Sequence, residues 1–149
     1  GRFDIENPFI LPSIENWGVI TDFDMYDIDN DGNTEIIITR TTGKDGVSSG
    51  YPMQGQYYDG HKVQILKNDG VDWINWKIVE QPPEIFNNPD IHITWVHSIK
   101  VYDVNNDCLL DIVPESDQMN AKSFSPLNSI RGLYYEQQSN GSFLIKYKE

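Results

Sequence analysis

The sequence is poor in the features that mark several common classes of protein. It has one cysteine in 149 residues, so no disulfide can form within the chain, and cysteine use indicates no redox compartment. No run of eighteen or more apolar residues is present, which predicts no membrane insertion. Basic residues are scarce, 11 against 23 acidic ones, and the net charge of −12 argues against binding of nucleic acid.

Familiar catalytic motifs are missing as well. The chain has no Gly-x-Ser-x-Gly elbow, no phosphate-binding loop and no context for a nucleophilic cysteine. Its three histidines, His61, His92 and His97, are expected to be structural rather than catalytic. Carboxylates are plentiful, so a pair of acids acting on a glycosidic bond stays open as an alternative.

The apolar segments are typical of short strands, and no stretch has a convincing helical period. Val19, Thr21, Phe23 and Met25 alternate with other residues and are predicted to share one strand face. Further strands are expected over 35–40, 62–70, 76–80, 133–141 and 143–147. The sequence therefore predicts an all-β fold of two four-stranded antiparallel units.

A short acidic loop, Asp27-Ile28-Asp29-Asn30-Asp31-Gly32-Asn33-Thr34-Glu35, follows the first of these strands. Acids at positions 1, 3, 5 and 9 and a carbonyl at position 7 supply the oxygens that calcium prefers. The predicted metal ligands are Asp27, Asp29, Asp31, Asn33 and Glu35. Gly32 permits a turn with positive φ. An EF-hand would need an acid at position 12, but Ile38 stands there, so the loop is not an EF-hand.

The same pattern returns in Asp103-Val104-Asn105-Asn106-Asp107-Cys108-Leu109-Leu110-Asp111. The equivalent predicted ligands are Asp103, Asn105, Asp107, Leu109 (through its carbonyl) and Asp111. Asn105 replaces an acid and Cys108 replaces the turn glycine, where we expect its side chain to tuck under the loop with some strain. Two loops predict up to two Ca²⁺ ions, with the first loop the better site.

Both loops, with the strands around them, resemble the FG-GAP/VCBS repeat, the calcium-loop unit of integrin-α-like β-propellers. The VCBS-like branch fits better, because the Phe-Gly and Gly-Ala-Pro signatures of the other branch are missing. The resemblance implies blade-like units and a fragment or relative of a β-propeller. It divides the chain into a leading segment or edge strand (1–16), a first unit (17–80), a linker (81–92) and a second unit (93–149).

The functional expectation follows from the loops and the resemblance. We expect a non-catalytic calcium-binding module of an exported protein, placed outside the cell, on its surface or in the periplasm. Its partner would be a glycan or an extracellular protein, bound in adhesion. The long 41–60 insertion carries the candidate ligand-binding residues Tyr51, Tyr57 and Tyr58, because exposed aromatic rings stack on sugars and anchor partners. The alternative is an accessory or terminal part of a propeller-type carbohydrate-active enzyme, such as a polysaccharide lyase.

Overall fold

The computed structural model describes residues 10–15, 17–41, 61–80, 98–115 and 133–147 of the chain. These residues form eight strands and contain no helix. The first unit holds β1 (Val19–Tyr26), β2 (Glu35–Thr41), β3 (His61–Asn68) and β4 (Trp73–Glu80). The second holds β5 (Ser98–Tyr102), β6 (Asp111–Glu115), β7 (Leu133–Gln137) and β8 (Phe143–Tyr147). Within the described ranges, no helical segment of membrane-crossing length and apolarity is found.

Each half of the chain forms its own antiparallel sheet. The strand orders are β1-β2-β3-β4 and β5-β6-β7-β8, so within each sheet every strand pairs with its neighbours in sequence. The prediction of an all-β fold with two four-stranded antiparallel units is confirmed. β4 begins earlier than the predicted residue 76, because Trp73 and Ile74 pair with Asn68 and Lys67 beside the connecting turn.

A bulge in β1 changes which of its residues share a face. The register shifts between Ile20 and Asp22, so Val19 lies opposite Thr41 while Phe23 lies opposite Ile38. Ile20 lies opposite Arg40, two positions from Ile38, so Ile20 and Phe23 share a face and Val19, which adjoins Ile20, points to the other face. The prediction that Val19 and Phe23 share a face is therefore wrong. A bulge adds one residue and reverses the alternation on either side of it.

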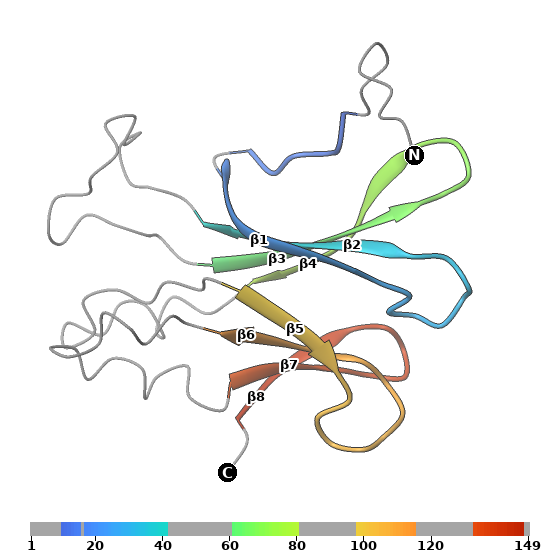
Figure 1. Cartoon of the computed structure of the whole chain (residues 1–149), viewed down its shortest axis with the longest axis vertical. Helices are drawn as coiled ribbons and strands as arrows, with labels where there is room; N and C mark the ends of the chain where they lie inside the picture. The colour runs from blue at the N-terminus through green and yellow to red at the C-terminus, as the bar shows by residue number, and fades with distance from the viewer. Residues whose placement is uncertain (1–9, 16, 42–60, 81–97, 116–132, 148–149) are drawn as a thin grey trace, which may run out of the picture.

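The two sheets lie one above the other, and β1 lies against β5 (Figure 1). The amide of Ile99 on β5 donates to Asp22 Oδ2 on β1 over 2.9 Å. A single core joins the sheets, and its side chains come from both of them and from the first acidic loop. Its buried members are Ile28, Ile37, Val63, Ile65, Val79, Ile99, Val101, Ile112 and Tyr135.

The two units stack head to tail, because they contribute opposite faces to this core. Ile36 and Ile112 are equivalent, since each directly follows the last acid of its loop. The core contains Ile112, but from the first unit it contains Ile37, whose side chain points to the other face from Ile36. The second sheet therefore packs on the first through the face that bears Ile112. The equivalent face of the first sheet, which bears Ile36, points away from the second sheet.

The outer face of the first sheet is partly covered by the chain before β1, which runs across it (Figure 1). The buried Arg40 side chain donates through Nε to Gln64 Oε1 at 2.6 Å and through Nη1 to the Trp17 carbonyl at 3.1 Å. Gln64 Nε2 donates to the Pro12 carbonyl at 2.9 Å and also to Asn75 Oδ1. These polar contacts satisfy buried groups and hold the leading segment on the sheet.

Candidate metal centre

Both acidic loops lie at the same end of the stacked sheets (Figure 1). One joins β1 to β2 and the other joins β5 to β6. The strand ends that flank the two long connections, at Thr41 and His61 and at Glu115 and Leu133, lie at the opposite end (Figure 1). Each sheet therefore separates its acidic loop from its long connection.

The first loop is held by its own carboxylates, which accept backbone N–H groups. Asp27 accepts from the amide of Asp31 through Oδ1 at 2.9 Å and from the amide of Gly32 through Oδ2 at 3.0 Å. Asp31 Oδ1 accepts from the amide of Asn33 at 2.8 Å, and Glu35 Oε2 accepts from that of Ile28 at 3.0 Å. Asp29 Oδ1 receives a longer bond, 3.3 Å, from the amide of Asp31. These bonds fold the loop so that its acids converge.

The second loop repeats this network position by position. Asp103 accepts from the amides of Asp107 and Cys108 at 3.1 and 2.9 Å, as Asp27 does from Asp31 and Gly32. Asp107 Oδ1 accepts from the amide of Leu109 at 2.9 Å, and Asn105 Oδ1 accepts from that of Asp107 at 3.0 Å. Two segments far apart in sequence thus adopt one hydrogen-bonding pattern.

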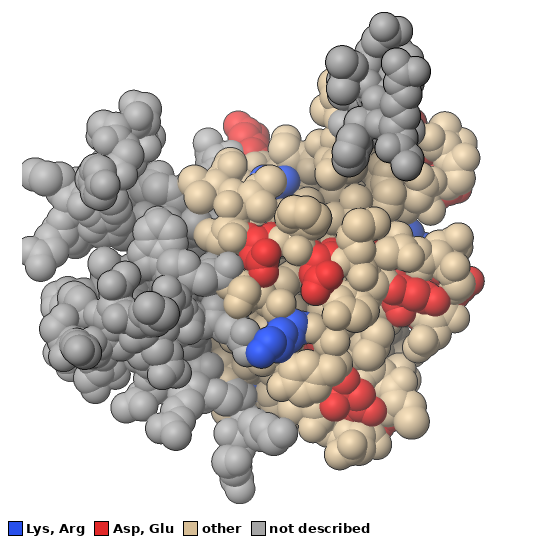
Figure 2. All heavy atoms as spheres, viewed as in Figure 1, with Lys and Arg blue, Asp and Glu red and all other residues tan. Residues whose placement is uncertain are grey.

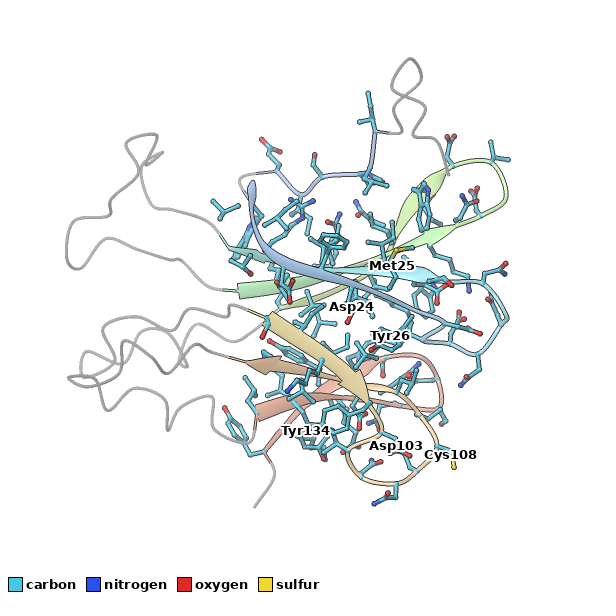
Figure 3. All side chains as sticks on the ribbon, viewed as in Figure 1. Asp24, Met25, Tyr26, Asp103, Cys108 and Tyr134 are labelled. Carbon is cyan, nitrogen blue, oxygen red and sulfur yellow. The ribbon has the colours of Figure 1, made fainter. Side chains whose placement is uncertain are left out.

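The backbone of both loops passes through the left-handed region at equivalent positions. Asn30 and Asn106, at position 4, have φ of 57° and 62°. Gly32 has φ of 90°, which confirms the predicted turn glycine, and Cys108 has φ of 69° at the same position. Cys108 is exposed, and Figure 3 shows its sulfur pointing outward. The prediction that it tucks under the loop is therefore wrong, because the positive φ directs the side chain outward, although the expected strain is present.

The acids of the first loop converge on Glu35, which is fully buried at the start of β2. Ligand atoms of Asp27, Asp29 and Glu35 lie within 4.8 Å of one another, a spacing that a single cation can bridge. Glu35 Oε2 is bonded to the Ile28 amide, whereas Glu35 Oε1 is buried and receives no hydrogen bond. Burial raises the pKa of Glu35 above its ordinary value. A buried carboxylate oxygen of this kind is a ready metal ligand.

Lys67 of β3 reaches into the same group of acids, a contact that the loop sequence alone does not reveal. Its Nζ pairs with Asp29 Oδ2 and Asp31 Oδ2 and lies 3.8 Å from Glu35 Oε1. Its hydrogen bonds to Asp29 and then Asp31 raise the pKa of Lys67, and the bond from Lys67 is the main cause that lowers the pKa of Asp31. The lysine therefore carries a full positive charge beside the candidate site.

The second loop ends on the buried Asp111, which is one carbon shorter than Glu35. Both of its oxygens accept backbone bonds at 2.9 Å, Oδ2 from the amide of Val104 and Oδ1 from that of Gln137. Burial raises the pKa of Asp111. Among the described residues, the three-carboxylate grouping occurs in the first loop, where an acid holds the position that Asn105 holds in the second. This difference agrees with the predicted ranking of the two loops, and metal binding by either loop stays a prediction.

Several predicted site residues lie outside the described part of the chain. They are Tyr51, Tyr57 and Tyr58. His92 and His97, which are predicted to be structural, lie outside it as well. His61 is the first residue of β3. The glycan-binding role of the tyrosines and the enzyme alternative stay predictions.

Two features of the site went unnoticed in the sequence. Lys67 stands one residue after the strand position that pairs with Ile36, so its proximity to the loop follows only from the β2–β3 register. Asn30 and Asn106 share position 4 of both loops, and asparagine tolerates the left-handed region better than most residues. The repeat of asparagine at that position indicates a residue with positive φ in each loop.

Acidic side chains lie at several separate places on the face drawn in Figure 2, and few basic ones lie among them. Asp22 and Asp24, on β1, belong to neither acidic loop. The negative charge of the chain is therefore not confined to the two loops.

Comparison of the chain with protein-family models, with curated proteins and with solved structures found no match.

Proposed function

We propose that this chain is a non-catalytic, calcium-stabilised β module of the FG-GAP/VCBS kind. The observation that carries the proposal is the hydrogen-bonding network shared by the two loops, which in the first loop brings ligand atoms of Asp27, Asp29 and Glu35 within 4.8 Å of one another. In the first loop this convergence includes the buried, unbonded Glu35 Oε1. A divalent cation would bond that oxygen and offset the mutual repulsion of Asp27, Asp29, Asp31 and Glu35.

The proposed role of the metal is structural. Each loop joins the first two strands of its sheet, so an ion bound there would fix the hairpin. Ile28, at position 2 of the first loop, is fully buried in the core between the sheets. Ordering of this loop therefore stabilises the packing of one unit on the other as well as its own turn.

Head-to-tail stacking supports the proposed relation to propellers. A heterologous interface of this kind can be repeated, because each unit uses a different face toward its neighbour. Phe23 and Met25, on the outward face of the first unit, are 63 % and 52 % exposed, whereas their equivalents Ile99 and Val101 are buried in the core. A propeller continues this stacking through four to eight blades. We propose that the chain is a fragment or relative of such an array.

The wider role that we propose is adhesion by an exported or cell-surface protein, through binding of a glycan or a protein. It rests on the resemblance and on the calcium argument, since loops of modest affinity fill where calcium is about millimolar. The long connections would supply the contact, because their flanking strand ends lie on one edge, away from the metal loops (Figure 1).

Removal of calcium tests the metal role directly. At a free calcium concentration of about 100 times Kd, one bound ion stabilises the fold by roughly 2.7 kcal/mol. For a chain of this size that corresponds to a rise in Tm of about 5–10 °C. We expect EDTA to lower Tm by that amount and added calcium to restore it, measured by circular dichroism. Identical melting curves in EDTA and calcium would overturn the proposal.

Two matched substitutions test the ranking of the loops. Asp29→Ala removes one of the three carboxylates that converge in the first loop. Asn105→Ala removes the neutral side chain at the same position of the second loop. We expect the larger loss of calcium affinity for Asp29→Ala, by calorimetric titration, because ligand charge sets affinity in such loops. Asp24→Ala, on β1 outside the loop, is the control and should bind as the wild type does. Equal losses in the two loop variants would contradict the ranking.

A further inference from the structure

The first acidic loop already holds a cation, the ammonium group of Lys67. Its Nζ pairs with Asp29 and Asp31 and lies 3.8 Å from Glu35 Oε1. Two of these three carboxylates, those of Asp29 and Glu35, also belong to the group that could hold a metal ion. The ammonium therefore sits against the oxygens that a divalent cation would need.

The lysine is fixed in this position by its surroundings. It lies on β3, one residue after Leu66, which pairs with Ile36 beside the loop. Its Nζ lies 5.1 Å from the centre of the Trp76 ring, and Trp76 packs against the core. Its side chain is 19 % exposed. A cation held between an aromatic face and carboxylates leaves such a position at a cost.

The fit of the ammonium to the site is incomplete. Glu35 Oε1 is fully buried and receives no hydrogen bond, and its distance from Lys67 Nζ is too long for one. Lysine offers a single charge at one point, whereas a calcium ion binds six to eight oxygens at once. The loop therefore retains a buried ligand that the lysine does not satisfy and that a divalent ion would.

The second unit has the opposite charge at the same place. Ile112 pairs with Tyr135 as Ile36 pairs with Leu66, so Glu136 is the equivalent of Lys67. The Glu136 carboxylate accepts hydrogen bonds from Tyr134 Oη at 3.2 Å and Gln138 Nε2 at 2.8 Å. The two loops thus share one backbone pattern but differ in the charge beside them: β3 supplies a cation to the first loop, whereas its counterpart β7 has an acid at the equivalent position.

We propose that Lys67 is an internal counter-ion of the first loop, which a divalent cation must displace in order to bind. Binding there is an exchange of an ammonium for a metal ion, so Lys67 raises the calcium concentration at which the loop fills. It also neutralises part of the charge of the loop when calcium is scarce. This inference rests on the proposed calcium function and adds a regulator to the same site.

The test is a titration of the full chain with calcium, measured by calorimetry, and with Tb³⁺, measured by the luminescence of the bound ion. The second loop is disabled in every protein by Asp103→Asn with Asp107→Asn, so that the first loop alone is measured. Lys67→Met keeps the length of the side chain and removes its charge. We expect it to tighten calcium binding by roughly tenfold, because a positive charge a few ångströms from the ion is removed.

Lys62→Met is the matched control. Lys62 lies on the same strand, pairs with Glu80 and stacks over Trp17 at 4.5 Å, so it has the same kinds of contact at a distance from the loop. We expect its calcium affinity to equal that of the parent. In EDTA, Lys67→Met should also lower Tm more than Lys62→Met does, because the acids of the loop lose their counter-ion.

The outcomes separate the two proposals. Equal calcium affinity in the parent and in Lys67→Met would overturn the counter-ion and leave the calcium function standing. Binding by Lys67→Met alone would support the counter-ion in its strongest form. If neither protein binds calcium or Tb³⁺, both proposals are overturned.

Discussion

The amide of Ile28 donates a hydrogen bond of 3.0 Å to Glu35 Oε2, across the whole of the first acidic loop. The same bond joins the amide of Val104 to Asp111 Oδ2 in the second loop, at 2.9 Å. In both cases the acid is fully buried and the amide belongs to the residue directly after the first aspartate. This bond ties the end of each loop to its beginning, so the last acid sets the shape of the loop before any ion arrives.

Glu35→Gln should therefore have opposite effects with and without calcium. Burial raises the folded-state pKa of Glu35 above its ordinary value of 4.5. The stability linked to this group is thus fully present below that value and is lost as the pH rises through the raised pKa. At neutral pH in EDTA, we expect Glu35→Gln to raise Tm, because a buried charge is removed and an amide oxygen can still accept from Ile28.

In excess calcium the wild type should have the higher Tm. Glu35→Gln has lost a charged ligand and should bind calcium at least roughly tenfold more weakly. Thermal melts of both proteins in EDTA and in calcium, at neutral pH and near pH 4, measure all of these effects. In EDTA the difference between the proteins should shrink as the pH falls. A variant that is less stable than the wild type in EDTA at neutral pH would contradict the account of Glu35.

The conformation of Cys108 leads to a second prediction. This residue has φ of 69° where Gly32 has 90° in the first loop, and its amide donates to Asp103 Oδ2. A side chain in the left-handed region costs roughly 1–2 kcal/mol. Substitution by glycine removes this strain, but part of the gain is lost because glycine has a larger conformational entropy in the unfolded chain. We expect Cys108→Gly to stabilise the protein by up to about 1 kcal/mol, measured by denaturant unfolding at a fixed calcium concentration.

Cys108→Ala is the control for the loss of the thiol. It keeps a Cβ at the strained position and should have the stability of the wild type under reducing conditions. The backbone bond to Asp103 is available to all three proteins. Should the glycine variant prove less stable than the alanine variant, the strain assigned to this position would be absent.

The number of units, their four strands and the two loops could be predicted from the sequence. Each of these depends on contacts between residues close in the chain, such as Asp27 with Gly32, and the repeat of the pattern at Asp103 reinforced the signal. β-Branched residues at 36–38 likewise indicate a strand whatever they pack against.

Features that depend on register could not be predicted. The bulge beside Ile20 has no glycine to mark it, and it moved Val19 to the face opposite Phe23. The contact of Lys67 with Asp29 joins residues on different elements and requires the pairing of Ile36 with Leu66 to be known. A shift of one residue in that pairing would turn Lys67 to the other face of the sheet.

The different burial of Phe23 and Ile99 gives the last prediction. Each lies four residues before the first aspartate of its loop, but Phe23 is 63 % exposed and Ile99 is 5 % exposed. Ile99 packs in the core between the sheets, so Ile99→Ala should destabilise the chain by about 2–4 kcal/mol. Phe23→Ala removes a larger side chain, yet it should cost less than about 1 kcal/mol, because little of the ring is buried within the chain. Denaturant unfolding of the two variants compares them directly. Comparable losses would mean that Phe23 is covered in solution, against its exposure on the outer face of the first unit.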